Sequence, residues 1–240
     1  MAVIGLAGQS AFMTADQFPI PGETITCGSL FFELGGKGYN QAIACARMGV
    51  ETVFVGAVGA DANGKDCRCE LEKEGVISCL VEKEEPTAYA VITTRADSEN
   101  TVAVYSGAAK CLCKADLRKE GIRREIEKCD YLLLQNELST ECLEAAFELA
   151  REVNIPVIFN PAPARHIPPE LLVRSAVITP NYGEAKELMG CRPDDELSEV
   201  KLAELFRKRG IKQAVVTMGS RGALLIDEDI SVMIPAVLCG

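Results

Sequence analysis

The chain has 240 residues, of which 48% are hydrophobic and 25% are charged. This composition supplies a sizeable core and excludes an intrinsically disordered chain, and the length suits one large α/β domain or two small domains. A formal net charge of −10 excludes broad binding to nucleic acid or to anionic membranes, because both need a basic surface. A single nucleotide remains compatible with this charge, since a few local donors are enough to bind a phosphate.

The eleven cysteines and the single histidine do not form a metal-binding pattern. Cys67 with Cys69 and Cys111 with Cys113 are C-x-C pairs, but no C-x-x-C pair occurs, and His166 has no partner at zinc-ligand spacing. An odd number of scattered cysteines without a secretory signal indicates reduced, mostly buried thiols. We therefore expect a cytoplasmic protein.

The chain begins with an apolar stretch that predicts a buried strand at Val3 to Leu6. The stretch lacks the basic residues of a signal peptide and turns polar within the first ten residues. Gly5-Leu6-Ala7-Gly8 begins like a dinucleotide-binding loop, but a third glycine and a clear helix after it are missing. A nicotinamide-dependent dehydrogenase is therefore only a weakly supported alternative.

Two segments, Phe18 to Leu34 and Thr87 to Tyr105, combine strand-forming residues with turn residues. Asp97 to Asn100 has the composition of a hairpin tip. We predict a small antiparallel sheet outside the main one, which would form a lid from about residue 17 to 35 and from 86 to 106. Two extra edge strands on the main sheet are the alternative.

The stretch Gly35 to Gly49 is the most informative part of the chain. Three glycines and Lys37 lead directly into a helix of small residues. Glycine lets the backbone approach a ligand closely, and a helix start offers free N–H donors with a partial positive charge. This arrangement suits a hydroxyl-rich or anionic ligand, although a plain glycine turn before a packed helix would have the same composition.

A second glycine-containing segment, Gly59 to Asp66, nearly matches a P-loop. Asp66 stands where a serine or threonine should bind magnesium, so a carboxylate would face the phosphates. We therefore reject a P-loop at this place.

The remainder of the chain alternates short apolar runs with amphipathic helical patterns. This alternation predicts a parallel, doubly wound sheet, and we find no internal repeat or linker. The expected strands are Val3–Leu6, Val53–Val58, Tyr131–Leu134, Pro156–Phe159, Ala176–Thr179 and Ala214–Thr217, and the expected helices include Thr140–Val153, Tyr182–Met189 and Glu196–Arg209.

Polar clusters follow four of the expected strands. In an open α/β sheet the ligand binds beyond the carboxyl ends of the strands, so these clusters should converge on one crevice. The clusters are Gln135–Glu137, Asn160–Ala164, Thr179–Glu184 and Thr217–Gly222.

These segments together resemble the PfkB (ribokinase-like) carbohydrate kinases. The resemblance begins with Gly35 to Ala42 and Phe18 to Thr24, and it runs collinearly through the last three of the polar clusters just named. It implies a ribokinase-like α/β fold over residues 1–240, a β lid that can form a homodimer, and ATP-dependent phosphorylation of a sugar hydroxymethyl group.

The resemblance also implies roles for individual residues. Asn181 and the loop from Thr217 to Gly222, with Gly219 and Ser220, would bind ATP phosphates, and Glu184 would place Mg²⁺ indirectly. The residues that would bind the sugar are Gly8, Ser10, Gly36, Lys37, Gly38, Asn40 and Glu137.

Two departures from the family pattern bear on activity. Where the family has an Asn-x-Asp pair that grips the sugar, this chain has Gly8-Gln9-Ser10, and a serine offers no bidentate carboxylate. The Gly-Ala-Gly-Asp motif, which supplies the catalytic base, does not occur in the 240 residues. We expect that motif, and the monovalent-cation (K⁺) site of the family, to lie beyond Gly240 in a missing C-terminal part.

Sequence alone therefore leaves two main hypotheses. The first is a sugar kinase that phosphorylates a sugar or a related polyol or nucleoside, with weak or no activity in these 240 residues. The alternative is a non-catalytic protein of the same fold that binds a sugar or nucleotide, or dimerises.

Overall fold

The main sheet has nine strands in the order β13-β12-β11-β10-β9-β8-β1-β4-β5. The computed structural model describes residues 1–97 and 99–237. Neighbouring strands are parallel from β5 at one edge of the sheet as far as β11. Strands β12 and β13 complete the other edge with antiparallel pairing. The mainly parallel α/β fold expected from the sequence is confirmed. The strands are β1 (Ala2–Ile4), β4 (Val53–Gly59), β5 (Ile77–Lys83), β8 (Leu132–Gln135), β9 (Val157–Asn160), β10 (Val177–Ile178), β11 (Ala214–Thr217), β12 (Ala223–Ile226) and β13 (Ser231–Ile234).

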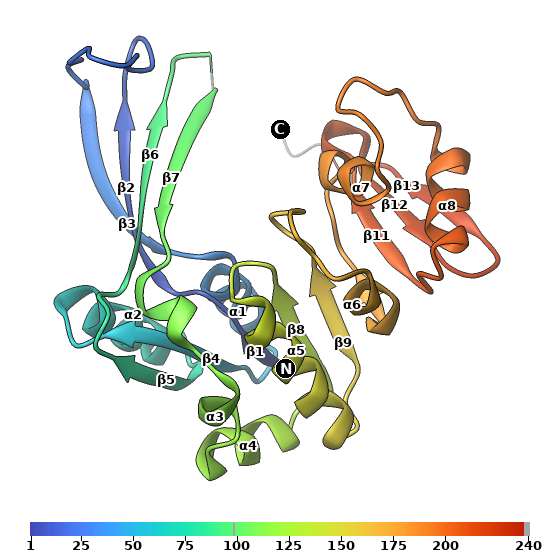
Figure 1. The fold of residues 1–240 in the computed structure, drawn as a ribbon, viewed down its shortest axis with the longest axis horizontal. Coiled ribbons are helices and arrows are strands. Elements are labelled where there is room, and N and C mark those ends of the chain that lie inside the picture. The colour runs from blue at the N-terminus through green and yellow to red at the C-terminus, as the bar shows by residue number, and fades with distance from the viewer. Residues whose placement is uncertain (98, 238–240) are drawn as a thin grey trace.

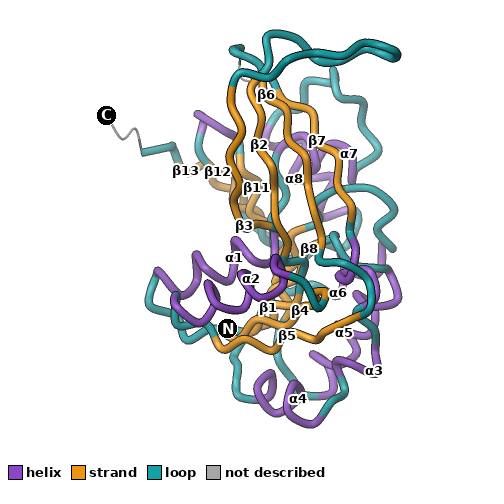
Figure 2. The backbone as a smooth tube through the Cα atoms, turned by 90° about the vertical axis from the view of Figure 1, so that its left-hand side faces the viewer, coloured by secondary structure: helices purple, strands orange, loops and turns teal. Residues whose placement is uncertain are grey.

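Helices cover both faces of this sheet, as a doubly wound fold requires. Figure 2 shows α1 and α2 on one side and α3 to α6 on the other. Successive residues of β1 divide between the two layers: Val3 packs with α1 and α2, whereas Ile4 belongs to the larger core on the opposite face. The helices are α1 (Lys37–Arg47), α2 (Ala62–Lys73), α3 (Lys114–Leu117), α4 (Glu120–Glu127), α5 (Thr140–Glu152), α6 (Pro169–Arg174), α7 (Tyr182–Leu188) and α8 (Glu199–Lys208).

Serine caps determine where two of the expected helices begin. The Ser139 hydroxyl accepts a hydrogen bond from the Cys142 N–H at 3.2 Å, so α5 starts at Thr140 as predicted. The Ser198 hydroxyl likewise accepts from the Lys201 N–H, so α8 starts at Glu199. The prediction that this helix begins at Glu196 was wrong by three residues, because the cap lies further along the chain.

A separate four-stranded sheet rises from the main sheet (Figure 1). Its order is β3-β2-β6-β7, with β2 (Gly8–Thr14), β3 (Ser29–Gly35), β6 (Ala88–Thr94) and β7 (Asn100–Tyr105). The expectation of a small sheet outside the main one is therefore confirmed, and the alternative of two edge strands is wrong. We call these four strands the lid.

The composition of the lid differs from the prediction in two ways. Strand β2 lies inside the lid sheet and pairs in parallel with β6, so the sheet is mixed rather than antiparallel. Of the first expected lid segment only Ser29–Gly35 is a strand, because the chain from Ala15 to Gly28 is an irregular loop containing Gly22 at φ 85°. Ser98, within the expected hairpin tip, lies outside the described residues.

The root of the lid is fixed by one partly buried cluster of hydrogen bonds. The Asp61 carboxylate accepts from the Thr87 N–H at 2.8 Å, the Thr87 hydroxyl at 2.6 Å and the Gly64 N–H at 2.8 Å. The Thr87 hydroxyl in turn accepts from the Gly59 N–H at 2.9 Å. The segment that resembled a P-loop therefore starts α2 and ties the end of β4 to the start of the lid.

Candidate functional site

A cavity of about 190 Å³ lies where the lid meets the main sheet. It collects six of the seven residues expected to bind a sugar, from β2, from the start of α1 and from the loop after β8. We call it the lid cavity. The six residues are Gly8, Ser10, Gly36, Lys37, Asn40 and Glu137.

The glycines beside this cavity are required by close backbone packing. Gly36 has φ 110°, and a Cβ atom there would lie 2.4 Å from the Leu6 carbonyl oxygen. Gly38, the seventh expected residue, does not line the cavity: a Cβ atom on it would lie 2.7 Å from the Gly5 Cα. Gly38 therefore lets α1 approach β1. Its position does not support a direct contact with a sugar.

Glu137 and Lys37 form the charged floor of the lid cavity. The Glu137 carboxylate accepts from the Lys37 backbone N–H at 2.7 Å and from Lys37 Nζ at 3.2 Å. Helix α1 has no cap from its own Gly36, so Glu137 satisfies one of its free N–H groups from across the sheet. A carboxylate with remaining lone pairs and an ammonium group together suit the hydroxyls of a sugar.

The lid wall of the cavity is mainly apolar. Ser10 pairs with Ala90 and then Val104, and the neighbouring register is Phe12, Ile92 and Val102. Among the described residues, none hydrogen-bonds to the Ser10 hydroxyl, so this group remains able to bind a ligand. The cavity therefore combines one charged side with one apolar side that bears a single hydroxyl.

The residues expected to bind ATP gather at the carboxyl ends of β10 and β11. Asn181 forms a parallel bridge with Thr217, and the Thr217 N–H donates to the Pro180 carbonyl oxygen at 3.0 Å. Gly219 and Ser220 follow in a short 3₁₀ turn (Gly219–Arg221), and Gly222 has φ 105°. The structure thus brings all five predicted residues to one edge of the sheet.

Asn181 and Glu184 also form a capping box at the start of α7. The Asn181 Oδ1 accepts from the Glu184 N–H, and the Glu184 carboxylate accepts from the Asn181 N–H, each at 2.8 Å. One carboxylate oxygen of Glu184 is not used by this pair. Within the described part of the chain no group of three or more His, Cys, Asp or Glu side chains is placed to hold a metal ion.

A chain of side-chain amides runs between the two groups of residues. The amide of Gln135 donates to Gln41 Oε1 at 2.5 Å, Gln41 reaches Asn160 Oδ1 at 3.4 Å, and Asn160 donates to the Thr179 carbonyl oxygen at 2.6 Å. Gln135 is fully buried, and its Oε1 lies beside Gly5 and Gly38. The strand-end clusters pointed to Gln135 and Asn160, but the sequence did not indicate Gln41 or the connection.

The structure of the segment Gly5-Leu6-Ala7-Gly8 excludes the alternative of a dinucleotide-binding loop. Gly8 is the first residue of β2, so a lid strand rather than a helix follows Gly5-Leu6-Ala7-Gly8. The helix whose N-terminus would receive a pyrophosphate is absent at this place in the described chain.

The fold and the site define a doubly wound α/β protein whose lid sheet stands over a polar cavity at the carboxyl ends of the strands. A family profile described as pfkB family carbohydrate kinase matches residues 1–239, so the chain belongs to this family. A ribokinase of Haemophilus influenzae is 34% identical over 227 residues, which cover 94% of this chain and 74% of that protein.

Two further relatives are similar to this chain over almost its whole length. A deoxyribokinase of Salmonella typhi is 31% identical over 98% of this chain and 78% of its own length. The structure of the Arabidopsis thaliana ribokinase complexed with ribose and ATP has a TM-score of 0.84 at 26% identity and covers 98% of this chain and 77% of that one. The prediction of the family from the sequence is confirmed.

The sequence predicts no catalytic residue within the 240 positions. Gly240, beyond which the family's catalytic Asp was expected, lies outside the described residues together with residues 238 and 239. The placement of that Asp after Gly240 therefore stays a prediction. The site as described consists of the sugar-binding and phosphate-binding candidates alone.

Proposed function

We propose that this protein binds a sugar in the lid cavity and ATP at the ends of β10 and β11, as an ATP-dependent kinase for a sugar hydroxymethyl group. The observation that carries the proposal is the lid cavity itself, in which Ser10, Lys37, Asn40 and Glu137 meet from three separate parts of the chain. In this family the nucleotide supplies the phosphoryl group.

The cavity residues would hold and orient the sugar. Glu137 is held in place by hydrogen bonds from the Lys37 N–H and ammonium group. Its remaining lone pairs therefore have a fixed direction and can accept hydrogen bonds from sugar hydroxyls. Closure of the apolar lid wall over the cavity would exclude water from the transferring group. Because Ser10 offers only a hydroxyl, we infer a substrate that needs few strong hydrogen-bond acceptors on the lid side. A deoxy sugar, a polyol or a nucleoside would meet this condition.

The residues at β10 and β11 fit phosphate groups. Backbone N–H groups in the turn from Gly219 to Gly222 and the side chains of Asn181 and Thr217 offer donors at one edge of the sheet. The unused oxygen of Glu184 would help place Mg²⁺ through water. A K⁺ site, expected from the family, has no residue assigned to it in these 240 positions.

Catalytic power is a separate question from binding. The family's Gly-Ala-Gly-Asp motif is not in the 240 residues, and in family members its Asp takes the proton of the acceptor hydroxyl. We therefore expect these residues by themselves to bind sugar and to transfer phosphoryl groups slowly or not at all.

The test is titration calorimetry with ribose, 2-deoxyribose, polyols and nucleosides, followed by an ATP-coupled assay. We expect saturable binding of at least one of these compounds and turnover well below the usual range of about 1–100 per second. Glu137→Gln should weaken that binding by about tenfold or more, because a charged acceptor is lost. Glu141→Gln, an exposed change in the first turn of α5, is the matched control.

A lack of sugar binding by the intact chain would contradict the proposal. Turnover at an ordinary kinase rate would contradict the expected weak activity but not the proposed sugar binding. Sugar and ATP binding without any turnover would agree both with the proposed weak kinase and with the alternative of a non-catalytic binding protein.

We also propose the remaining properties of the molecule from its surface. Residues 1–240 form one domain with its lid, and two lids pair through Phe31, Val102 and Val104, which are about half exposed. Ten cysteines are free thiols in the described residues, in keeping with a reducing cytoplasm. None of the described helices has the length and apolar character needed to cross a bilayer.

A further inference from the structure

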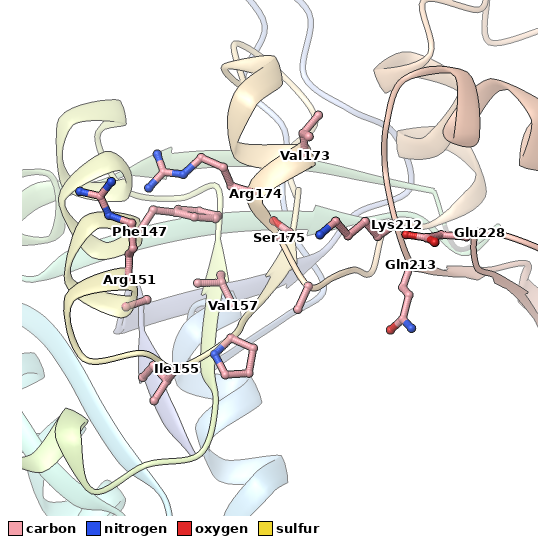
Figure 3. A pocket seen from close by; sticks show the side chains of 13 residues that line it. Phe147, Arg151, Ile155, Val157, Val173, Arg174, Ser175, Lys212, Gln213 and Glu228 are labelled. Carbon is pink, nitrogen blue, oxygen red and sulfur yellow. The ribbon is translucent and has the colours of Figure 1, made fainter.

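A second cavity, of about 590 Å³, lies at the opposite end of the main sheet from the lid (Figure 3). Pro156 and Val157 line it where β9 begins, Ala176 precedes β10, and Lys212 and Gln213 precede β11. The cavity is therefore at the amino ends of three parallel strands, whereas the lid cavity and the ATP residues are at carboxyl ends. We call it the amino-end cavity.

This cavity concentrates positive charge in an acidic protein. Arg151, Arg174 and Lys212 line it, and Glu228 is its single acidic lining residue. The whole chain carries a formal charge of −10. Within the described residues, none of the three cationic side chains makes an ion pair or a hydrogen bond, although most other basic residues do. The three positive charges in the lining thus exceed the single negative charge of Glu228.

The carboxylates nearest in sequence to Arg151 are already bound elsewhere. Glu148 pairs with Lys114 at 2.6 Å, and Glu152 pairs with Arg118 at 2.5 Å and with Arg123 at 3.0 Å. These pairs hold the acidic groups of α5 toward α3 and α4. Arg151 is left facing the cavity.

Two features of their surroundings stabilise the positive charges of Arg151 and Arg174 without an acidic partner. Both lie in the last turn of their helices, α5 and α6, where the partial negative charge of the helix end favours a cation. The Arg174 guanidinium also lies over the Phe147 ring, 5.2 Å from its centre. Figure 3 shows both guanidinium groups on the α5 side, while Lys212 extends toward Ser175 from the opposite side.

Apolar residues form much of the remaining wall between these cations. Ile155, Val157 and Val173 line the cavity beside Phe147. A cavity of this size is in the range that holds a drug-sized or nucleotide-sized molecule. Guanidinium groups bind phosphate through paired N–H donors, and the apolar wall suits a base or another flat, uncharged body.

We propose that the amino-end cavity is a binding site for a nucleotide-like phosphate ester, separate from the catalytic crevice. The phosphate contacts the Arg151 and Arg174 guanidinium groups, Lys212 adds positive charge from the opposite side, and the apolar body of the ligand packs against Val157 and Val173. The site does not depend on the proposed kinase function, because none of its residues contributes to the lid cavity or to the β10 and β11 loops.

Titration calorimetry on the intact chain tests the site with pyrophosphate, AMP and adenosine as probes. We expect AMP to bind more tightly than pyrophosphate, adenosine to bind weakly, and the affinity for both anions to fall with added salt. The double variant Arg174→Gln, Lys212→Gln should weaken AMP binding by about tenfold or more, since charge-assisted hydrogen bonds are lost. Arg174→Lys with Lys212→Arg retains the charges and should retain most of the binding of both anions.

Two control variants test whether this AMP binding occurs in the amino-end cavity. Lys65→Gln with Arg192→Gln removes the same charge from exposed residues outside the cavity and should leave AMP binding unchanged. Asn181→Ala changes the expected ATP site and should leave unchanged the AMP binding that the Arg174 and Lys212 changes weaken. The proposal is overturned if millimolar AMP and pyrophosphate do not bind, if the Lys65 and Arg192 changes weaken binding equally, or if Asn181→Ala removes the binding.

Discussion

Gly36 has to satisfy two geometric requirements at the edge of the lid cavity. Its φ of 110° is unfavourable for any residue with a side chain, and a Cβ atom would lie 2.4 Å from the Leu6 carbonyl oxygen. The backbone there must move if a side chain is added. That movement would shift the Lys37 N–H away from Glu137 and disturb the floor of the cavity.

We predict that Gly36→Ala weakens sugar binding by about tenfold or more and destabilises the fold by about 1–3 kcal/mol. Gly22→Ala is the matched control, because Gly22 has φ 85° but no atom within 4 Å of the Cβ position. The control should show only the loss of stability that results from placing a side chain at a positive φ. Calorimetry and urea unfolding measure both effects. Equal stability losses with unchanged sugar affinity in both variants would contradict this role of Gly36.

Asp116 is the second residue whose surroundings allow a quantitative prediction. It is 4% exposed, and its carboxylate binds Lys83 at 2.6 Å and Lys119 at 2.9 Å. Burial by itself raises the pKa of Asp116, but hydrogen bonds from Lys83, Lys119 and Cys113 outweigh it and hold this pKa well below its usual range. The charged form is therefore favoured by folding and connects β5 to α3.

We predict that Asp116→Asn lowers the free energy of unfolding at pH 7 by about 3 kcal/mol, because two lysines lose a buried partner. A depressed carboxylate pKa contributes stability above the pKa of the unfolded chain, near 4, and loses it as the pH falls further. The difference between wild type and variant should therefore shrink below about pH 4. Urea unfolding at pH 7 and pH 3.5 measures it, and a difference that stays constant would contradict the assignment.

At the level of elements, the lid depends on how its root is held. The start of β6 is fixed by Thr87, which is 2% exposed and exchanges hydrogen bonds with Asp61 and Gly59. Burial raises the pKa of Asp61, but the three hydrogen bonds from Thr87 and Gly64 lower it overall. The carboxylate therefore stays charged and keeps these donors at neutral pH.

We predict that Thr87→Val destabilises the protein by about 2 kcal/mol, because it leaves a buried N–H and carboxylate without their hydroxyl partner. Amide hydrogen exchange should become faster in β6 and β7 before it does so in the main sheet. Thr94→Val, at the far end of the same strand, is the control and should have little effect. Uniform acceleration of exchange over the whole chain would show that Thr87 does not act on the lid in particular.

The elements that sequence patterns did and did not reveal differ in kind. Six strands were expected at nearly their observed places, because buried parallel strands are continuous apolar runs. Strand β5 was missed because this edge strand is half exposed and ends in Glu82 and Lys83. Strand β2 was missed because Gly8, Gln9 and Ser10 have low strand propensity and pair only with segments far along the chain.

The same distinction applies to the site. Gly36 and its neighbours were found because a glycine-rich helix start is a local pattern. The amide chain from Gln135 through Gln41 to Asn160 was missed as a connection, because its members are 94 and 119 residues apart. Side-chain amides in strands and helices have no sequence signature, so only the sheet order and the packing of α1 bring them together.

At the scale of the whole molecule, two apolar surfaces remain open in the described structure. One is the inner face of the lid, where Phe31 is 47% exposed and Val102 is 55% exposed. The other is the face of β11 to β13 turned away from α8, where Val215, Leu225 and Val232 stand opposite one another in register. Exposed apolar patches of this kind favour association.

We predict that the protein self-associates and that the lid makes the specific contact. Phe31→Lys with Val102→Lys should convert a defined dimer into a monomer in sedimentation velocity, because two like charges would then face each other across the twofold axis. Leu225→Lys with Val232→Lys should leave the dimer intact and reduce only larger, polydisperse species. If the second pair of changes dissolves the dimer and the first does not, the β11 to β13 face is the interface. A monodisperse monomer in the unmodified chain would contradict both assignments, since it would mean that neither surface buries enough apolar area to offset the entropy of association.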